Sequence, residues 1–421
     1  MNKTIVIGAY ACEPYKGSEQ GVGWNWALQI AKCNKVIVIT RSNNEPVISD
    51  YLKKHPIDNI TFYYCDVPDS IRKYKKGSKG VHWYYYLWQY YCYKTAKEIL
   101  KKEHVDYTFT VTFGNMWLPT FLYKLPVKHI WGPIGGEAGI PKILWNKISL
   151  KQKVVECIRL INPYIPISNP FYKQICKKSY KIIARTEDVE KVLPSSCKDK
   201  VLVCLETGAS EEDCLNFKAS VEKLVATDDL VHVGQMIPRK MLDIAILAFA
   251  KVADKYQHVK FNLVGTGPEK HNLKALAKSL GLENRVVFHG VKPREEAIGL
   301  MQQSAIIVHP SVYEGGCWSL FEAMMSEKAI VCFDVSGNHV LMSDDCAELV
   351  PMMGHDEAVN IFAQKLDLLL GDKNLREKLG KAAHKRILTH FLWKNKGEEE
   401  RCKECQPPGP YSWMGSQSGG A

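Results

Sequence analysis

The sequence lacks the features of membrane-spanning and secreted proteins. No uninterrupted apolar stretch is long enough to cross a bilayer. The first ten residues hold a charged residue and a short apolar run before polar and glycine-rich sequence, so they predict a buried strand and not a signal peptide. We therefore expect a cytoplasmic protein, with a peripheral contact on the inner membrane face as its closest approach to lipid.

A paired spacing of cysteines is also lacking, although the chain has 14 of them. They are scattered through the sequence, which is typical of buried thiols in a reducing compartment and argues against a disulfide scaffold. Cys402 and Cys405 form a CxxC pair without the second pair that a zinc site needs. An Asp-X-Asp motif is absent as well. The sequence accordingly predicts no metal and no bound cofactor.

The chain lacks a balance of charge. Its net charge of +11 raises the question of an acidic partner. The basic residues are dispersed and no nucleic-acid-binding module is recognisable, so nucleic acid is not expected. The densest basic stretch, Arg72–Lys76 with Lys79, precedes the aromatic segment Trp83–Tyr93. Such a stretch suits an anionic headgroup layer. The alternative, which we favour, is an aromatic helix packed on the first sheet.

The chain length of 421 residues exceeds one ordinary core and predicts two domains of about 150–200 residues each. Short apolar runs alternate with helical stretches, which indicates parallel sheets covered by helices on both faces, an α/β architecture. We expect domains at 1–205 and 230–395, a linker at 206–229, and a disordered Gly- and Ser-rich tail at 396–421. The expected strands are Thr4–Ala9, Lys35–Thr40, Ile60–Cys65, Tyr107–Thr112, His129–Trp131, Lys181–Ala184, Leu230–Gly234, Lys260–Val264, Val286–His289, Ala305–His309 and Ala329–Phe333.

The most informative segment is Glu314-Gly-Gly-Cys-Trp-Ser-Leu-Phe-Glu322, between an apolar strand and a helical run. A strand that ends in a glycine turn and opens a helix presents free N–H groups to an anion such as a diphosphate. Gly315 and Gly316 allow the backbone to approach that ligand closely. The two carboxylates can accept hydrogen bonds from sugar hydroxyls. For Glu322 a second interpretation is open, because Ser319 and Glu322 also fit a capping box.

Four motifs in order give the second half a family resemblance. They are His232-Val-Gly-Gln-Met-Ile-Pro-Arg-Lys240, Phe261-Asn-Leu-Val-Gly-Thr-Gly-Pro268, Arg285-Val-Val-Phe-His-Gly290 and the segment with the two glutamates. Together they resemble the donor half of retaining glycosyltransferase family 4. The glycine-rich loop after the first strand resembles that of a bacterial branch used in polysaccharide biosynthesis. The resemblance implies the GT-B fold, with two facing Rossmann-like domains and a cleft between them.

The resemblance also implies roles for single residues. Lys240 would bind the donor diphosphate, Glu314 would act on the transferred sugar as the catalytic residue, and Glu322 would hold the ribose. The remaining donor-binding positions would be Gly234, Gly265, Gly267, Gly315 and Gly316. Gly17, Gly21 and Gly23 would form an acceptor or phosphate loop in the first domain.

The implied reaction moves a sugar from a nucleotide-diphosphate sugar to an acceptor hydroxyl, without a metal and with the anomeric configuration kept. The implied acceptor is a glycan or a lipid-linked molecule in cell-surface polysaccharide or glycolipid assembly. The sequence departs from the family pattern in three places. Gln235 stands where many relatives have arginine, and Val340 replaces a usual acidic residue. The strand end Phe109–Gly114 lacks the histidine that relatives often carry there. A nucleotide-sugar epimerase of GT-B fold and a non-catalytic nucleotide-sugar binder therefore remain alternatives.

Overall fold

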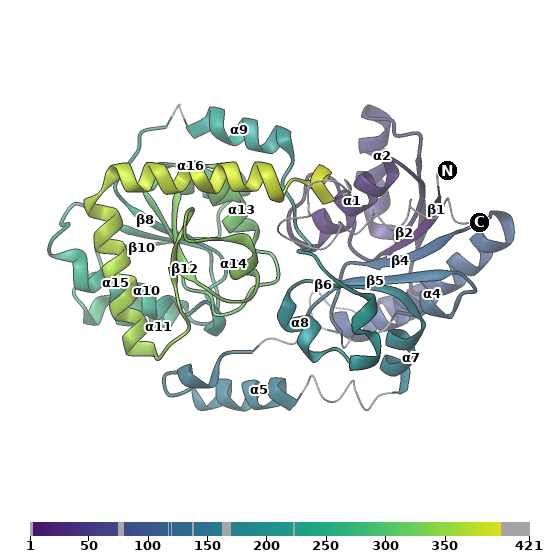
Figure 1. Ribbon diagram of the computed structural model, residues 1–421, viewed down its shortest axis with the longest axis horizontal. Helices are drawn as coiled ribbons and strands as arrows, with labels where there is room; N and C mark the ends of the chain where they lie inside the picture. The colour runs from purple at the N-terminus through teal and green to yellow at the C-terminus, as the bar shows by residue number, and fades with distance from the viewer. Residues whose placement is uncertain are drawn as a thin grey trace. The chain divides into compact units, whose positions relative to one another are not determined.

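The computed structural model describes residues 3–74, 80–116, 118, 120–136, 139–161, 170–221 and 224–396 (Figure 1). These residues form two compact units. The first unit contains the described residues of 3–136, 161–206 and 393–396, and the second contains 139–160 and those of 207–392. Each unit is built around its own parallel sheet.

The first unit has a seven-stranded sheet in the order β3-β2-β1-β4-β5-β6-β7, with parallel pairing throughout. Its interior strand β1 is almost wholly buried, since Ile5, Val6 and Ile7 have no exposed surface. Apolar residues in unbroken runs are what a strand covered on both faces requires. The strands are β1 Thr4–Ala9, β2 Lys35–Arg41, β3 Ile60–Cys65, β4 Tyr107–Val111, β5 Lys128–Ile134, β6 Ser179–Ala184 and β7 Val201–Val203.

The helices of the first unit include the long aromatic helix α4, Val81–Lys102. Tyr84, Tyr85 and Trp88 are buried in the core of this unit, which confirms the predicted packing of the aromatic segment. Within the basic stretch before it, residues 75–79 lie outside the described part of the chain. The other helices here are α1 Ser18–Ala31, α2 Glu45–Lys54, α3 Asp69–Arg72, α7 Pro170–Lys178 and α8 Glu187–Val192.

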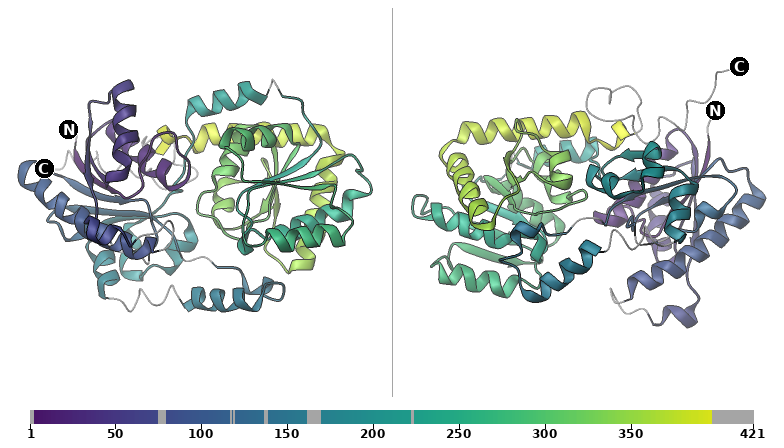
Figure 2. Two further views of the ribbon diagram at one scale, coloured as in Figure 1. Left: turned by 180° about the vertical axis from the view of Figure 1, so that it is seen from behind. Right: turned by 60° about the horizontal axis from the view of Figure 1, so that its bottom comes forward.

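The second unit has a six-stranded parallel sheet in the order β10-β9-β8-β11-β12-β13 with helices on both faces (Figure 2). Its strands are β8 Leu230–Val233, β9 Phe261–Val264, β10 Val286–Gly290, β11 Ile306–His309, β12 Ala329–Phe333 and β13 Glu348–Val350. Its helices are α5 Leu150–Ile161, α9 Glu211–Val221, α10 Leu242–Ala253, α11 Lys270–Ser279, α12 Arg294–Gln303, α13 Trp318–Met325, α14 Ser336–Leu341, α15 His355–Gly371 and α16 Lys373–His390. The last residue of α5, Ile161, is assigned to the first unit. In the described part of the chain, no helix is long and apolar enough to cross a membrane.

The order of strands creates a switch point in each sheet. In the second unit β8 lies between β9 and β11, so the connections after β8 and β11 leave in opposite directions. The first unit has the same arrangement at β1 and β4. Ligands of open parallel sheets bind at such points, beyond the carboxyl ends of the strands.

The predicted fold class and all 11 predicted strands are confirmed, each strand end within three residues of its expected position. The sequence prediction missed β7 and β13. Both are edge strands of three residues, which is too short for an apolar pattern to stand out. Such a strand forms because a neighbouring strand offers it free hydrogen-bonding groups.

The compact units do not divide the chain at the expected boundaries. Residues 139–160 group with the second unit although the first-domain strand β6 follows them, and residues 393–396 return to the first unit. The expected linker 206–229 contains α9, which belongs to the second unit. Of the tail expected at 396–421, residues 397–421 lie outside the described part of the chain.

Candidate functional site

The loop after β8 brings two cations to the switch point of the second unit. Gly234 follows the last residue of the strand, and the short 3-10 helix η5, Pro238–Lys240, comes next. The loop lies against the turn after β9, where Gly265 has φ +130° and a Cβ at this position would stand 1.9 Å from the carbonyl oxygen of Gly234. A Cβ on Gly267 would likewise stand 2.2 Å from the carbonyl oxygen of Met236. Close backbone contact thus explains these predicted glycines.

Glu314, on the loop after β11, joins these cations in a buried network. Lys240 donates from Nζ to Oε1 of Glu314. The guanidinium of Arg239 lies 2.9 Å from Oε2, and the Ser311 hydroxyl donates to Oε1 at 2.7 Å. The side chains of Lys240 and Glu314 are only 6% and 8% exposed. The structure therefore brings the predicted Lys240 and Glu314 together, and it adds Arg239 as a second positive charge.

The charge state of Glu314 follows from this network. Burial alone raises the pKa of the carboxyl, but the charge of Lys240, the contact with His309 and the charge of Arg239 outweigh burial and hold the pKa well below its usual range. Because the pKa is lowered on folding, the carboxylate contributes stability above the ordinary pKa of a glutamate. That contribution is lost as the pH falls through the lowered folded pKa. The group is therefore ionised at neutral pH.

Glu322 lies on α13 and is held from a different helix. Its Oε1 accepts hydrogen bonds from the guanidinium of Arg294, on α12, at 2.9 Å. Burial raises the pKa of Glu322, and Arg294 opposes that effect without cancelling it. The helix begins after Cys317, which makes no side-chain capping hydrogen bond. The capping-box interpretation of Ser319 and Glu322 is therefore wrong, because the carboxylate turns to Arg294 and not to the helix start.

The main chain between Glu314 and α13 is positioned to receive an anion. The carbonyl of Glu314 accepts hydrogen bonds from the N–H of Gly337 and the hydroxyl of Ser336, both at 2.9 Å. Among the described residues, none accepts a hydrogen bond from the N–H of Gly315, Gly316 or Cys317. Free amides at the start of a helix favour a phosphate group.

Cys317 is the residue of this segment whose chemistry the sequence did not indicate. Burial raises the pKa of its thiol, but His309 and Lys240 outweigh burial and bring the pKa down to about 7. Ligand atoms of His309, Glu314 and Cys317 all lie within 4.8 Å of one another, so these three could hold a metal ion. Both oxygens of Glu314 already face cations, which opposes a further positive charge here.

We expect the alkylation rate of Cys317 by iodoacetamide to rise with pH around a midpoint of about 7, against about 8.5 for an ordinary thiol. The reason is that the thiolate is the reacting species. Peptide mass spectrometry after timed quenching measures this rate, with the denatured protein as the control. A folded-state midpoint equal to the denatured one would show that His309 and Lys240 do not stabilise the thiolate.

The glycines of the predicted acceptor or phosphate loop lie at the start of α1, in the first unit. Gly17 precedes the helix, and Gly21 and Gly23 are buried in its first two turns. A Cβ on Gly23 would stand 2.1 Å from the carbonyl oxygen of Ala11, so this glycine is required for close contact with the loop after β1. These three glycines belong to the first unit, and the ion network belongs to the second.

Glu19, inside the same glycine-rich motif, was not predicted as a site residue. Its carboxylate accepts a hydrogen bond from the N–H of Phe113 at 2.8 Å and lies 3.4 Å from the guanidinium of Arg185. Thr112 and Phe113, after β4, both have positive φ values, 71° and 48°. Such strained backbone is found mostly at functional sites. Glu19 thus joins the loops that follow β1, β4 and β6.

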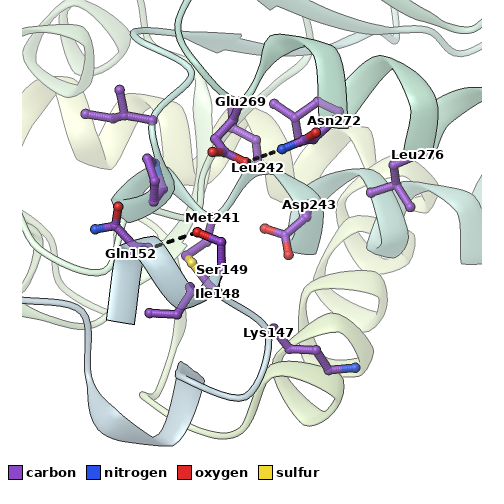
Figure 3. Close-up of a pocket in the computed structure, with 13 residues that line it drawn as sticks. Lys147, Ile148, Ser149, Gln152, Met241, Leu242, Asp243, Glu269, Asn272 and Leu276 are labelled. Carbon is purple, nitrogen blue, oxygen red and sulfur yellow. Dashed lines mark hydrogen bonds between the residues drawn. The ribbon is translucent and has the colours of Figure 1, made fainter. Parts of the chain in front are cut away.

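A cavity of about 440 Å³ lies beside η5 in the second unit (Figure 3). Pro238 and Met241 in its wall flank Arg239 and Lys240 in the sequence. The opposite wall comes from α5 and the residues before it, where Ser149 accepts a hydrogen bond from the Gln152 N–H at 3.2 Å. None of the predicted site residues lines this cavity, and no sequence motif indicated it.

Comparison with known proteins gives the second unit a family match. Residues 216–386 match the sequence profile described as glycosyl transferases group 1, and this range contains Lys240, Glu314 and Glu322. A poly(ribitol-phosphate) alpha-N-acetylglucosaminyltransferase of Staphylococcus aureus is 26% identical over 160 residues, 38% of this chain. The match covers 32% of that protein, so the chain spans about a third of this curated relative.

Solved structures resemble nearly the whole chain. Sucrose-phosphate synthase of Thermosynechococcus elongatus is similar with a TM-score of 0.61 and 16% identity, over 93% of this chain and 96% of that one. A Staphylococcus aureus TarM mutant in complex with fondaparinux, alpha-GlcNAc-glycerol and UDP is similar with a TM-score of 0.60 and 13% identity, over 93% and 98%. At these identities the likeness shows the fold alone. The chain therefore has the GT-B fold, and its residues 216–386 match a glycosyl transferases group 1 domain.

Proposed function

We propose that this chain is a retaining glycosyltransferase that moves a sugar, of hexose type, from a nucleotide-diphosphate sugar to an acceptor hydroxyl. One observation carries the proposal. Two cations from the loop after β8 meet a carboxylate from the loop after β11 at the switch point of the second sheet. This is where an open parallel sheet binds its ligand, and the charges suit a diphosphate beside a polyhydroxylated ring. The matched family profile covers all three residues.

Each group has a task that its chemistry supports. Lys240 and Arg239 would stabilise the negative charge that develops on the departing diphosphate, and the free amides at Gly315, Gly316 and Cys317 would bind its oxygens. Glu314 would accept hydrogen bonds from the transferred sugar, and Glu322 from the ribose. Without a donor, Glu314 pairs with both cations and offsets part of their charge. A bound diphosphate would take over that role and release Glu314 to the sugar.

The missing arginine at position 235 does not remove the second positive charge from this site. Gln235 is exposed, whereas the neighbouring Arg239 lies 2.9 Å from Glu314 and donates to the Tyr313 carbonyl at 2.8 Å. We infer that Arg239 replaces the family arginine from a position four residues later. This supports a transferase over a binder that has lost its donor site.

The acceptor and the cellular setting are proposed from the activity of a named relative and from the state of the cysteines. The Staphylococcus aureus relative is named for transfer of N-acetylglucosamine to poly(ribitol-phosphate), which favours a glycan or lipid-linked acceptor in cell-surface polysaccharide or glycolipid assembly. Every cysteine in the described part of the chain is free, which fits a cytoplasmic enzyme. The cations beside Glu314 can stabilise the negative charge of the leaving diphosphate without a metal ion. We therefore propose that turnover needs no metal and continues in excess chelator.

A thermal-shift screen against UDP-, GDP-, ADP- and TDP-sugars tests the donor site. A donor present at 100 times its Kd stabilises the folded state by about 2.7 kcal/mol, which is a rise in melting temperature of about 5 °C or more. We expect one nucleotide to give this rise in the wild type. Lys240→Ala removes a diphosphate contact and Glu322→Gln a ribose contact, so both should abolish most of it.

Matched controls come from exposed positions of the same unit. Lys251→Ala on α10 and Glu296→Gln on α12 make the same chemical changes away from the site and should keep the full response. If no nucleotide sugar shifts the wild type, the transferase proposal is wrong. Conversion of a nucleotide sugar to its epimer without any acceptor would instead establish the epimerase.

A further inference from the structure

Helix α5 is fixed to the second unit by its polar face. Glu156, 1% exposed, accepts hydrogen bonds from the Ile140 N–H at 2.8 Å, from the Gln152 side chain at 2.6 Å and from Arg159 at 2.9 Å. Arg159 also donates to the Tyr313 hydroxyl at 2.6 Å. Tyr313 immediately precedes Glu314, so this helix is tied to the loop that carries the ion network. Its only acidic side chain is therefore buried, on the side that faces the unit.

The opposite face of α5 is apolar and exposed. Leu150, Val154 and Ile158 are 78%, 55% and 56% exposed. Their spacing of four residues places them in one stripe along the helix. Ile143, in the short turn before the helix, adds a further exposed apolar side chain. The helix thus exposes these apolar side chains and buries its acid, which is the reverse of an ordinary surface helix.

Lysines border this stripe on both sides. At about 100° per residue, Lys151 follows Ile158 around the helix and Lys153 precedes Leu150, so the stripe lies between them. Lys142 and Lys147 stand in the segment just before the helix. Among the described residues 139–161, Glu156 is the single acid against five Lys and Arg residues. A protein partner would need acidic and apolar side chains in a row that matches this stripe. An anionic lipid surface supplies negative charge in its headgroups and apolar groups in its acyl chains, without a matching row.

We propose that the outer face of α5 binds an anionic lipid surface, with the helix parallel to the membrane plane. Leu150, Val154 and Ile158 enter the boundary between headgroups and acyl chains, and Lys151 and Lys153 extend beside them to the phosphates. Lys142 adds longer-range attraction, whereas Lys147 is paired with Asp356 at 3.0 Å. This contact differs from the one suggested by the sequence at residues 72–93, and it holds whether or not the proposed transfer reaction is correct.

The contact also has a consequence for the site. The Arg159 to Tyr313 hydrogen bond joins the lipid-facing helix to the Glu314 loop through two adjacent residues. A lipid surface that orients α5 would therefore orient the loop beneath it. An acceptor carried by lipid would be presented to the same unit that holds the ion network.

Cosedimentation of the full chain with vesicles tests the proposal, in the absence of any nucleotide. We expect binding to mixed phosphatidylglycerol and phosphatidylcholine vesicles, and at least tenfold weaker binding to phosphatidylcholine alone. The triple variant Leu150→Ser, Val154→Ser, Ile158→Ser should lose binding. Lys151→Gln with Lys153→Gln should weaken it about fivefold for each lysine removed. Of these side chains Lys153 is half-buried and the others are solvent-exposed, so an unchanged melting temperature checks that the variants fold.

The matched control is an exposed aromatic row in the first unit, formed by Trp83, Tyr86 and Tyr90 of α4. Replacing all three with serine should leave vesicle binding unchanged. A dye on Cys157, which is exposed on α5, should report an apolar environment when vesicles are added, in a variant with Cys33, Cys317, Cys402 and Cys405 changed to serine. The proposal is overturned if the α5 variants bind as the wild type does, if the α4 variant abolishes binding, or if the stripe variant only converts a dimer to a monomer.

Discussion

Replacing Glu314 with glutamine is expected to lower the free energy of unfolding by about 3–5 kcal/mol, because the change leaves two cations facing a neutral amide in a buried position. Lys240 and Arg239 both contact this carboxylate. Denaturant unfolding of wild type and variant, followed by circular dichroism, measures the difference. The loss should be full at neutral pH and should shrink only as the pH falls below the ordinary range of a glutamate, because the pKa of Glu314 is lowered on folding.

Glu296→Gln is the matched control for this change. Glu296, on the exposed surface of α12, pairs with Lys292, two residues before the helix, at 3.0 Å. Such a pair contributes about 0–1 kcal/mol. If the two variants lose equal stability, the network around Glu314 contributes no more than a surface ion pair. The assignment of its cations to a diphosphate would then lose its physical basis.

Replacing Gly265 with alanine is expected to cost about 2–4 kcal/mol, because it combines an unfavourable backbone conformation with a steric clash. The residue has φ +130°, and the new Cβ would stand 1.9 Å from the Gly234 carbonyl oxygen. The clash would also displace the loop that leads to Lys240. We therefore expect this variant to lose stability in denaturant unfolding and to lose the donor-induced thermal shift as well.

Gly299→Ala is the control for this change, because there we expect alanine to stabilise the protein. Gly299 lies inside α12, and a Cβ there meets nothing within 4 Å. Alanine should raise stability by about 0.5–1 kcal/mol at this position, because glycine loses more backbone freedom in a helix. If Gly265→Ala were as well tolerated as Gly299→Ala, the close contact between the turns after β8 and β9 would not constrain the site.

Glu322 shows where a local sequence pattern misleads. Ser319 and Glu322 have the spacing of a capping box, yet the carboxylate lies against Arg294, 28 residues earlier. A pattern within four residues cannot reveal a competing partner on another helix. Arg239 shows the converse, since the sequence predicts no role for it, yet it reaches the same carboxylate as the predicted Lys240.

The sequence by itself determined the two parallel sheets, 11 of their strands and the residues whose order resembles a donor-binding half. Those features depend on short apolar runs and glycines that are local in the chain, so composition and spacing are enough to find them. Only the tertiary structure decided the partners of Glu314 and Glu322, the attachment of α5 to the second unit and the exposure of its apolar stripe. Each of these depends on which groups, distant in the sequence, come into contact in the folded chain. The energy of such a contact cannot be estimated from a single segment, because both partners must be known.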